Sequence, residues 1–155
     1  MKKTNAARML DKLKIAYELI EYQVDESDLS AVHLAETAGI PISMVFKTLV
    51  LEGDKNGNLV CIIPGGDEID LKKAAIASSN KKVAMIKMKD LESLTGYIRG
   101  GCSPLGMKKQ FPVYIDENAF NHPVIYISAG VRGMQMILSP GDLLSACKAI
   151  RATLT

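Results

Sequence analysis

The sequence predicts an α+β fold with a mixed β-sheet that curls towards a barrel. Helical and strand-like segments are interspersed, but not in the regular strand–helix alternation of a doubly wound sheet. The Asn56-Gly57 pair lies between two β-branched segments and favours a tight hairpin turn, which joins antiparallel strands. A length of 155 residues suits one domain with one sizeable core, which we place at residues 1–155.

The first third of the chain is expected to form a helix, a strand and a second helix. Thr4 or Asn5 can cap the first helix and Ser30 the second, because their side-chain oxygens accept hydrogen bonds from first-turn amides. Gly39 suits the end of the second helix, where a residue with positive φ is common. The predicted elements are a helix over residues 5–14, a strand over 17–22, a helix over 31–38 and a turn or short helix opened by Pro41.

The middle of the chain predicts the hairpin and three further elements. Residues 45–51 and 59–63 are rich in β-branched and apolar side chains and form the two arms of the hairpin. Asp70 can cap the next helix, and Gly96 ends the last one. These elements are a helix over residues 71–78, a strand over 83–86 and a helix over 90–95.

The C-terminal part predicts three strands followed by a helix. Ser139 is a suitable cap, Pro140 fits the first helical position and Asp142 the third, which is close to a capping box. We expect strands over residues 112–115, 123–128 and 134–138, a turn over 129–133, and a final helix that runs to about Arg151.

Residues 96–106, Gly-Tyr-Ile-Arg-Gly-Gly-Cys-Ser-Pro-Leu-Gly, fit neither helical nor strand periodicity, and we name them the glycine loop. Consecutive amides in such a loop can form a concave anion site, and glycine lets its backbone approach another molecule closely. The alternative is a long connector whose glycines only turn the chain. Because connections this long are uncommon in compact domains unless they are functional, we favour a binding loop.

The net charge of +2 conceals a basic segment. Residues 1–69 carry 7 basic and 11 acidic residues, residues 70–110 carry 9 and 3, and residues 111–155 carry 3 and 3. The basic segment contains the glycine loop, so a polyanionic partner and a set of solvated lysines explain it about equally well. Its cations are Lys72, Lys73, Lys81, Lys82, Lys87, Lys89, Arg99, Lys108 and Lys109.

Several other classes of protein are disfavoured. The three cysteines form no CxxC pair and there are two histidines, so we expect neither a disulfide framework nor a metal site, and no cofactor. No apolar run approaches the ~20 residues that span a bilayer. The N-terminal Met-Lys-Lys-Thr-Asn-Ala-Ala lacks the apolar core of a signal peptide, so we expect a cytoplasmic protein.

Lys47 is the most informative single residue, because it interrupts the apolar strand over residues 45–51. An ammonium group in such surroundings needs a partner or a path to water. It can point into a pocket at a phosphate or carbonyl oxygen, or it can protect an edge strand from aggregation. The residues alone leave both interpretations open.

Nucleophilic catalysis by the protein has little support. Cys102 lies in the glycine loop with no histidine near it in sequence, so a small loop side chain is a better interpretation than a thiolate nucleophile. Neither histidine lies in a nucleophile motif, and the glycine loop lacks the lysine–serine ending of a P-loop. Tyr22 and Ser128 end predicted strands, where side chains often border a site, although each alone fits an ordinary surface residue.

Three motifs occur in order: Val-Phe-Lys-Thr-Leu-Val around Lys47, the glycine loop, and Ile-Ser-Ala-Gly-Val-Arg-Gly from Ile127. Together they resemble the YbaK/EbsC family of bacterial Cys-tRNA(Pro) deacylases, which is related to the editing domain inserted in prolyl-tRNA synthetase. The resemblance extends from Asn5 to the last predicted helix. It implies a mixed six- or seven-stranded β-barrel surrounded by helices.

The resemblance also implies the activity and the site. The activity would be removal of cysteine from mischarged tRNA(Pro), with the substrate's own thiol attacking the ester. Lys47, Gly100 and Gly101 would be the catalytic positions, with the lysine on the terminal phosphate, ribose or ester and the glycine backbone holding the amino acid. The aminoacyl group would contact Tyr22, Thr48, Cys102, Ser128 and Gln135, where Gln135 replaces an acidic residue of some relatives. Arg99, Lys72, Lys73, Lys108 and Lys109 would bind acceptor-stem phosphates.

Two other functions stay open. One is deacylation of a different amino acid, such as alanine. The other is a non-catalytic module that binds tRNA or protein, although no interleaved aromatic residues suggest a single-strand RNA binder. Prolyl-tRNA synthetase as a partner is suggested by the resemblance alone.

Overall fold

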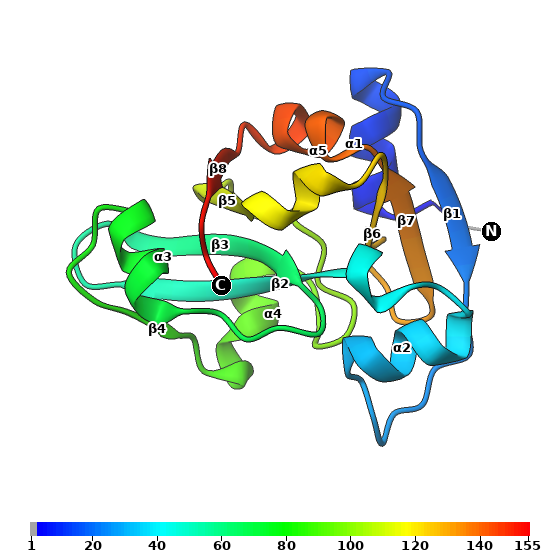
Figure 1. The fold of residues 1–155 in the computed structure, drawn as a ribbon, viewed down its shortest axis with the longest axis horizontal. Helices are drawn as coiled ribbons and strands as arrows, with labels where there is room; N and C mark the ends of the chain where they lie inside the picture. Colours follow the sequence, from blue (N-terminus) through cyan, green and yellow to red (C-terminus); the bar gives the residue numbers. More distant parts are fainter. Residues whose placement is uncertain (1–2) are drawn as a thin grey trace.

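The computed structural model describes residues 3–155, so the first two residues of the N-terminal stretch discussed above lie outside it. In the described part, five α-helices and three short 3-10 helices surround two sheets (Figure 1). The helices are α1 (Asn5–Leu13), α2 (Ala31–Ala38), η1 (Ile42–Met44), α3 (Leu71–Ala77), η2 (Met88–Asp90), α4 (Leu91–Thr95), η3 (Glu117–Asn121) and α5 (Pro140–Cys147). The strands are β1 (Glu18–Glu21), β2 (Phe46–Gly53), β3 (Gly57–Pro64), β4 (Val83–Met85), β5 (Val113–Asp116), β6 (Ile125–Ser128), β7 (Met134–Leu138) and β8 (Ile150–Ala152).

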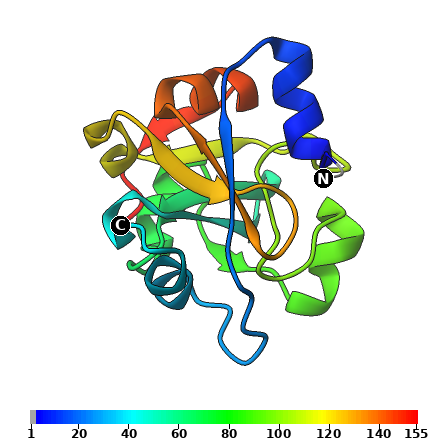
Figure 2. The same cartoon turned by 90° about the vertical axis from the view of Figure 1, so that its right-hand side faces the viewer.

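The prediction of an α+β fold is confirmed, but the prediction of a six- or seven-stranded barrel is wrong. The described residues form two open sheets, one with the order β1-β7-β6 and one with the order β4-β2-β3-β5-β8. Figure 1 shows β7 between β1 and β6, and in Figure 2 β1 crosses in front of the other two strands. Within residues 3–155, the one backbone bridge between the sheets is the isolated pair Val45 and Tyr126, because β2 continues into the five-stranded sheet while β6 pairs with β7.

Local sequence chemistry determines most element ends. The side chains of Thr4, Ser30, Asp70 and Ser139 accept hydrogen bonds from first-turn amides, as their positions predicted. The hairpin is also confirmed, since β2 and β3 pair from Phe46–Pro64 to Gly53–Gly57. Its turn holds three residues, and the expected type I′ geometry is absent because Asn56 lacks the positive φ that this turn requires.

The last helix is shorter than predicted. It ends at Cys147, because Lys148 adopts a left-handed conformation with φ 51° and turns the chain. The following residues form β8, which pairs in parallel with β5 and was not predicted. The 3-10 helix η3 was also missed, whereas η1 confirms the short helix expected after Pro41.

The β2–β3 hairpin separates two hydrophobic clusters. Phe46, Val50, Val60 and Ile62 face a cluster that includes residues of α1 and α5. The alternate residues, among them Leu51 and Ile63, face a second cluster that includes α3. Since side chains alternate along a strand, Thr48 points to the first side of β2 and Lys47 to the second. This alternation determines how β2 borders the site.

Candidate functional site

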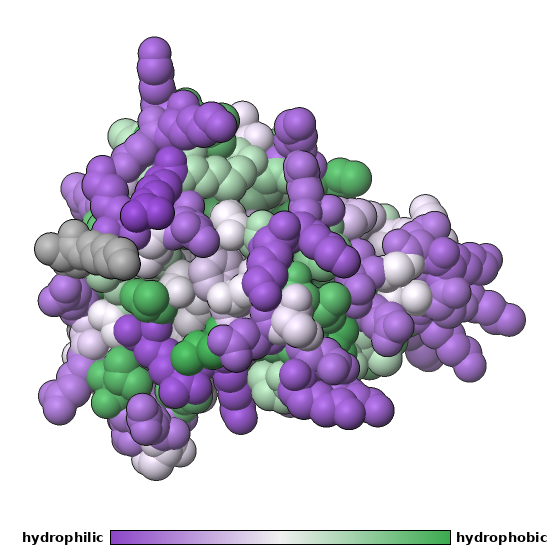
Figure 3. Space-filling model, turned by 180° about the vertical axis from the view of Figure 1, so that it is seen from behind, coloured by the Kyte–Doolittle hydropathy of each residue, from purple (hydrophilic) through white to green (hydrophobic). Residues whose placement is uncertain are grey.

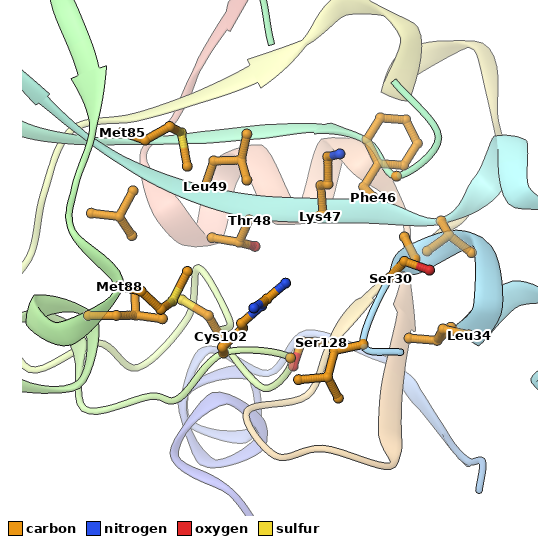
Figure 4. Close-up of a pocket in the computed structure, with 18 of the residues that line it drawn as sticks. Ser30, Leu34, Phe46, Lys47, Thr48, Leu49, Met85, Met88, Cys102 and Ser128 are labelled. Carbon is orange, nitrogen blue, oxygen red and sulfur yellow. The ribbon is translucent and has the colours of Figure 1, made fainter. Parts of the chain in front are cut away.

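A cavity of about 320 Å³ lies between β2, the start of α2, the glycine loop and the paired strands β6 and β7. Figure 4 shows its lining, with Thr48 and Cys102 facing one another across the middle and Ser30 and Ser128 at one end. The predicted site residues that line this cavity are Lys47, Thr48, Arg99, Gly100, Cys102, Ser128 and Gln135. The three motifs, far apart in the sequence, therefore meet at one place.

Two side-chain hydrogen bonds hold the glycine loop, one between its ends and one from the β6–β7 turn to its interior. Tyr97 donates its hydroxyl proton to the Leu105 carbonyl at 2.6 Å, and Arg132 Nε donates to the Arg99 carbonyl at 2.8 Å. Gly100 has a φ of 82°, which few other residues adopt, and its backbone borders the cavity. Gly101 does not line the cavity, and its N–H donates to the Ile98 carbonyl at 2.9 Å. Gly100 is therefore the member of the pair that a ligand can contact.

Lys47 and Thr48 lie on opposite sides of β2, as Figure 4 shows. Strand β4 pairs only with residues from Leu51 to Gly53, so β2 is an edge strand where Lys47 lies. Lys47 is half-buried, and none of the ion pairs found in residues 3–155 involves it. Both interpretations of the sequence therefore apply to Lys47: it lies on an edge strand, and it lies at the rim of a cavity.

Two buried oxygen atoms in the cavity lining lack hydrogen-bond partners within residues 3–155: Thr48 Oγ1 and Gln135 Oε1. Gln135 is only 3% exposed and pairs with Ser128 across β6 and β7. Leaving a buried polar atom unpaired costs roughly 1–3 kcal/mol, so such atoms usually meet a ligand or water. Both oxygens can serve polar groups of a bound molecule.

The Cys102 thiol is in its protonated form at neutral pH. Burial raises its pKa to about 11, and the hydrogen bond with Thr95 only partly opposes this shift. Neither histidine lines the cavity. His33 is 3.5 Å from the Asp25 carboxylate, and the His122 ring packs edge-on against Phe46 at 6.4 Å. This part of the structure thus contains no thiolate–imidazole pair at the cavity.

The other predicted site residues are more scattered. Tyr22 lines a small adjoining cavity of about 20 Å³ that shares Gly100 with the main one. The Lys108 side chain packs beside Gly96, and Lys109 lines a separate cavity of about 390 Å³. Lys72 follows the cap of α3, and Lys73 Nζ donates to the Thr155 carbonyl at 2.6 Å. Of the five cations predicted to bind tRNA, Arg99 alone lines the main cavity.

Part of the basic segment lies at the tip of the β2–β3 hairpin, away from the main cavity. Figure 3 shows hydrophilic side chains covering the projecting end of the molecule, which the tip of the β2–β3 hairpin forms. Asp54 at this tip accepts hydrogen bonds from the amides of Lys81 and Lys82, so part of the basic segment lies there. The basic segment is therefore spread over the surface rather than gathered around one cavity.

Several lining residues were missed by sequence reasoning. Ser30 was recognised only as a helix cap, and Leu34, Leu49, Met85 and Met88 were not singled out. Apolar residues beside short strands look like ordinary core residues in a sequence, so no signal marked them. Among residues 3–155, no group of three or more His, Cys, Asp or Glu side chains could hold a metal ion. In the same range, no helix has the length and apolarity needed to cross a membrane.

The fold is that of an aminoacyl-tRNA editing domain. The model of this family matches residues 26–146, and the chain belongs to the family, within its YbaK/EbsC branch. The resemblance drawn from the three motifs is thereby confirmed.

The chain is similar to particular members of the family over nearly its whole length. It is 52% identical over 153 residues to EbsC of Enterococcus faecalis, whose assigned activity is Cys-tRNA(Pro)/Cys-tRNA(Cys) deacylation, covering 99% of this chain and 93% of that protein. A solved structure of a proposed trans-editing enzyme for prolyl-tRNA synthetase has a TM-score of 0.84 at 24% identity, covering 99% of both chains. A hypothetical protein of known structure has a TM-score of 0.88 at 19% identity, covering 97% of this chain and 99% of that one. These structural likenesses establish the fold.

Proposed function

We propose that this protein is a trans-editing deacylase that removes cysteine from mischarged tRNA, with Cys-tRNA(Pro) as its substrate. The observation that carries the proposal is the cavity in which Lys47, the Gly100 backbone and the two unpaired oxygens of Thr48 and Gln135 meet. The 52% identity to EbsC, a protein assigned this activity on Cys-tRNA(Pro) and Cys-tRNA(Cys), supports it.

The reaction needs no nucleophile from the protein. The sulfur of the bound cysteinyl group attacks its own ester carbon, the bond from that carbon to the ribose oxygen breaks, and the thiol proton ends on the ribose oxygen. The products are a cysteine thiolactone, which water then opens, and the free 3′ end. The protonated state of Cys102 is consistent with this route, because a protein thiol of raised pKa is a poor nucleophile.

The chain contributes position and charge. Gln135 Oε1 is a pure acceptor and suits the α-ammonium group of the amino acid, while the Thr48 hydroxyl can bond the ester or the thiol. Lys47, at the rim and on the other side of β2, suits the terminal phosphate or ribose oxygens. Holding the thiol near the carbonyl carbon is the main catalytic act in this scheme.

The test compares deacylation of purified Cys-tRNA(Pro) by the wild type, Lys47→Ala and Cys102→Ala. We expect the wild type and Cys102→Ala to be active and Lys47→Ala to be inactive. Loss of activity in Cys102→Ala would instead make the protein thiol the nucleophile. If the wild type binds tRNA without any turnover, the protein is a binding module.

Ala-tRNA(Pro) provides the second comparison. An alanyl ester has no thiol, so the wild type should leave it almost untouched. Rapid cleavage of the alanyl ester would replace cysteine by alanine as the substrate and remove the need for the substrate thiol.

The wider context is also part of the proposal. The family model supports residues 26–146 as the centre of a single editing domain at 1–155. Charged tRNA is a cytoplasmic substrate, which fits a cytoplasmic protein. A domain this small reads little beyond the acceptor end, so prolyl-tRNA synthetase is the natural partner to supply selectivity for tRNA(Pro).

A further inference from the structure

A cavity of about 390 Å³, which we name the second cavity, lies apart from the main one, and no residue of the described chain lines both. Its walls come from the end of α1, from residues 104–113 and from the end of α5. Figures 1 and 2 show α1, in blue, next to α5, in orange-red, at the top of the molecule. The glycine loop separates the two cavities, because Cys102 lines the first while Pro104 and Gly106 line the second.

The walls of the second cavity are mainly apolar. Their apolar side chains include Met9, Leu13, Met107, Phe111, Val113 and Cys147. Val113 and Cys147 are 6% and 7% exposed, whereas Leu13 is 48% exposed, so the cavity reaches from the edge of the core to solvent. Protein interiors are close-packed and leave few voids larger than a water molecule. A volume of about 390 Å³ instead falls within the range of roughly 300–1,000 Å³ that small-molecule sites occupy.

Three exposed lysines border this apolar space and come from three separate segments. Lys12 belongs to α1, Lys109 to the chain that follows the glycine loop, and Lys148 to the end of α5. None of them takes part in an ion pair found among residues 3–155. Within the same range no Asp or Glu lines the cavity, and burial raises the pKa of the Cys147 thiol to about 12, so this thiol is uncharged at neutral pH. The lining therefore carries positive charge alone.

The alternative is that the lysines only compensate the partial negative charge at helix C-termini, which applies to Lys12 and Lys148. In both helices, however, backbone N–H groups beyond the helix end already donate to carbonyl groups of the last turn, as Ala149 does to Leu144 at 2.9 Å. Lys109 lies on no helix, so this explanation does not include it. A ligand that requires positive charge explains all three positions.

A ligand of this cavity has to use both features. An uncharged apolar molecule would contact the walls and leave the lysines without a partner, and a compact anion such as phosphate would meet the lysines but not the walls. An apolar chain or ring that carries one acidic group uses both. Its apolar part leaves water when it enters the cavity, and its acidic group accepts charge-assisted hydrogen bonds from the ammonium groups at the rim.

We propose that the second cavity binds a small amphipathic anion, an apolar chain or ring with one acidic group. This site goes beyond the proposed editing function, because it takes a different ligand and lies outside the main cavity. Of the residues that the sequence analysis assigned to the substrate or to tRNA, Lys109 is the one that lines it, and in this assignment Lys109 binds an anion other than tRNA.

The experiment separates charge from apolar surface on both sides of the interaction. The probes are octanoate, which has a chain and a charge, 1-octanol, which has the chain alone, and acetate, which has the charge alone. Their dissociation constants are measured at neutral pH by NMR titration of the full chain, which also identifies the backbone amides that respond. The variants are Lys12→Gln/Lys109→Gln, which removes two charges, and Leu13→Gln, which removes exposed apolar surface from the cavity.

Matched control variants are available elsewhere on the surface. Lys81→Gln/Lys82→Gln removes two exposed charges at the tip of the β2–β3 hairpin, and Ile76→Gln replaces an apolar side chain that is 78% exposed. None of these three residues lines a described cavity.

We expect saturable binding of octanoate by the wild type, with responses at residues 9–13, 104–113 and 146–148, and binding of 1-octanol and acetate at least about tenfold weaker. The lysine pair should lose about tenfold in affinity for octanoate and nothing for 1-octanol, because only octanoate carries a charge. Leu13→Gln should weaken both by about fivefold, since both bury the same chain. The control variants should match the wild type.

Four results would overturn the assignment. They are the absence of saturable octanoate binding, responses outside the residues of the second cavity, and equal affinity of the wild type and the lysine pair for octanoate. The fourth is a response of the same amides to protein concentration without any probe, which would assign the cavity to a second copy of this chain. Because the titration contains no tRNA, its outcome is independent of the deacylation test.

Discussion

Arg132 Nε donates a 2.8 Å hydrogen bond to the backbone carbonyl oxygen of Arg99. This bond ties the turn between β6 and β7 to the glycine loop, and Gly100, the next residue, borders the cavity. The same guanidinium group is 3.9 Å from Glu26, but Glu26 is 84% exposed and such a surface pair contributes little. The position of the Gly100 backbone therefore depends on the bond to Arg99.

Replacing Arg132 by Met should lower kcat/KM for Cys-tRNA(Pro) about tenfold, or ~1.4 kcal/mol, because the loop loses a charged donor. Arg132 contacts no substrate in the proposed scheme, so it is a positioning residue. The measurement is steady-state deacylation together with the Tm, which should change little.

Two controls separate the loop bond from charge alone. Glu26→Gln removes the surface pair and should keep full activity. Arg151→Met removes a comparable guanidinium group, which binds Glu117 at 2.8 Å and lies over the Phe120 ring, far along the chain from the loop. Equal losses in Arg132→Met and Arg151→Met would show that the bond to Arg99 does not position the site.

Gly101 has a structural reason to be glycine even though it does not line the cavity. A Cβ at this position would lie 3.0 Å from the Arg132 backbone nitrogen and 3.1 Å from the Val131 carbonyl carbon. Backbone atoms cannot move aside as a flexible side chain can, so Gly101→Ala should destabilise the fold by roughly 1–3 kcal/mol. Urea unfolding measures this change.

Gly141 provides the control for the Gly101→Ala variant. A Cβ there would meet nothing within 4 Å, and it lies in the first turn of α5. Gly141→Ala should leave stability unchanged or raise it by about 0.4–1 kcal/mol, because alanine restricts the unfolded chain. A stable Gly101→Ala variant would mean that the glycine loop and the 129–133 turn can separate without cost.

Cys102 should react slowly with alkylating reagents near neutral pH. Burial raises its pKa to about 11 from an ordinary value of 9.0, so the reactive thiolate is scarce. Below that pKa the thiolate fraction rises about tenfold per pH unit, so the rate of iodoacetamide labelling should keep rising to about pH 10 and beyond, when an ordinary thiol has levelled off. Mass spectrometry of the labelled peptide measures the rate.

The other two cysteines give an internal comparison. Burial raises the pKa values of Cys61 and Cys147 to about 12, so both should react more slowly than Cys102 while the protein stays folded. Labelling of Cys102 that levels off near pH 8 would contradict the protonated thiol, and the cysteine would have to be reconsidered as a nucleophile.

The sequence analysis succeeded where local chemistry decides the structure. The caps Thr4, Ser30 and Asp70 predicted helix starts because a side-chain oxygen needs only the next few amides. The cavity could be anticipated because Lys47 and the glycine loop depart from the surrounding periodicity. Such departures are local and visible in the chain itself.

The failures concern pairings between distant segments. Strand β8 has only three residues, with Ile150 56% exposed, so no periodicity marks it, and it forms because β5 offers a parallel edge. The six- or seven-stranded barrel was implied by the family resemblance, whereas closure depends on which strand edges meet in this chain. Met85 borders the cavity because β4 pairs with β2, and no pattern in the sequence encodes that contact.

Asp116, at the end of β5, holds the C-terminal segment in place. It is 1% exposed, and its Oδ1 accepts hydrogen bonds from the Leu154 N–H at 2.9 Å and the Thr155 hydroxyl at 3.3 Å. Its Oδ2 accepts from the Asn118 N–H at 3.1 Å. Asp116→Ala leaves the Leu154 amide buried without a partner, so we expect a loss of roughly 2–4 kcal/mol in the free energy of unfolding.

The Asp116→Asn variant keeps the shape of the side chain and changes only its hydrogen bonding. The amide keeps one acceptor oxygen for Leu154 and loses the one for Asn118, so its loss in urea unfolding should lie between those of the wild type and Asp116→Ala. Asp67→Ala, an exposed carboxylate, should stay within about 0.5 kcal/mol of the wild type. Deacylation per folded molecule should be unchanged in all three, because neither Asp116 nor β8 lines the main cavity. A variant that is stable but inactive would show that the C-terminal segment acts on the site rather than on the fold.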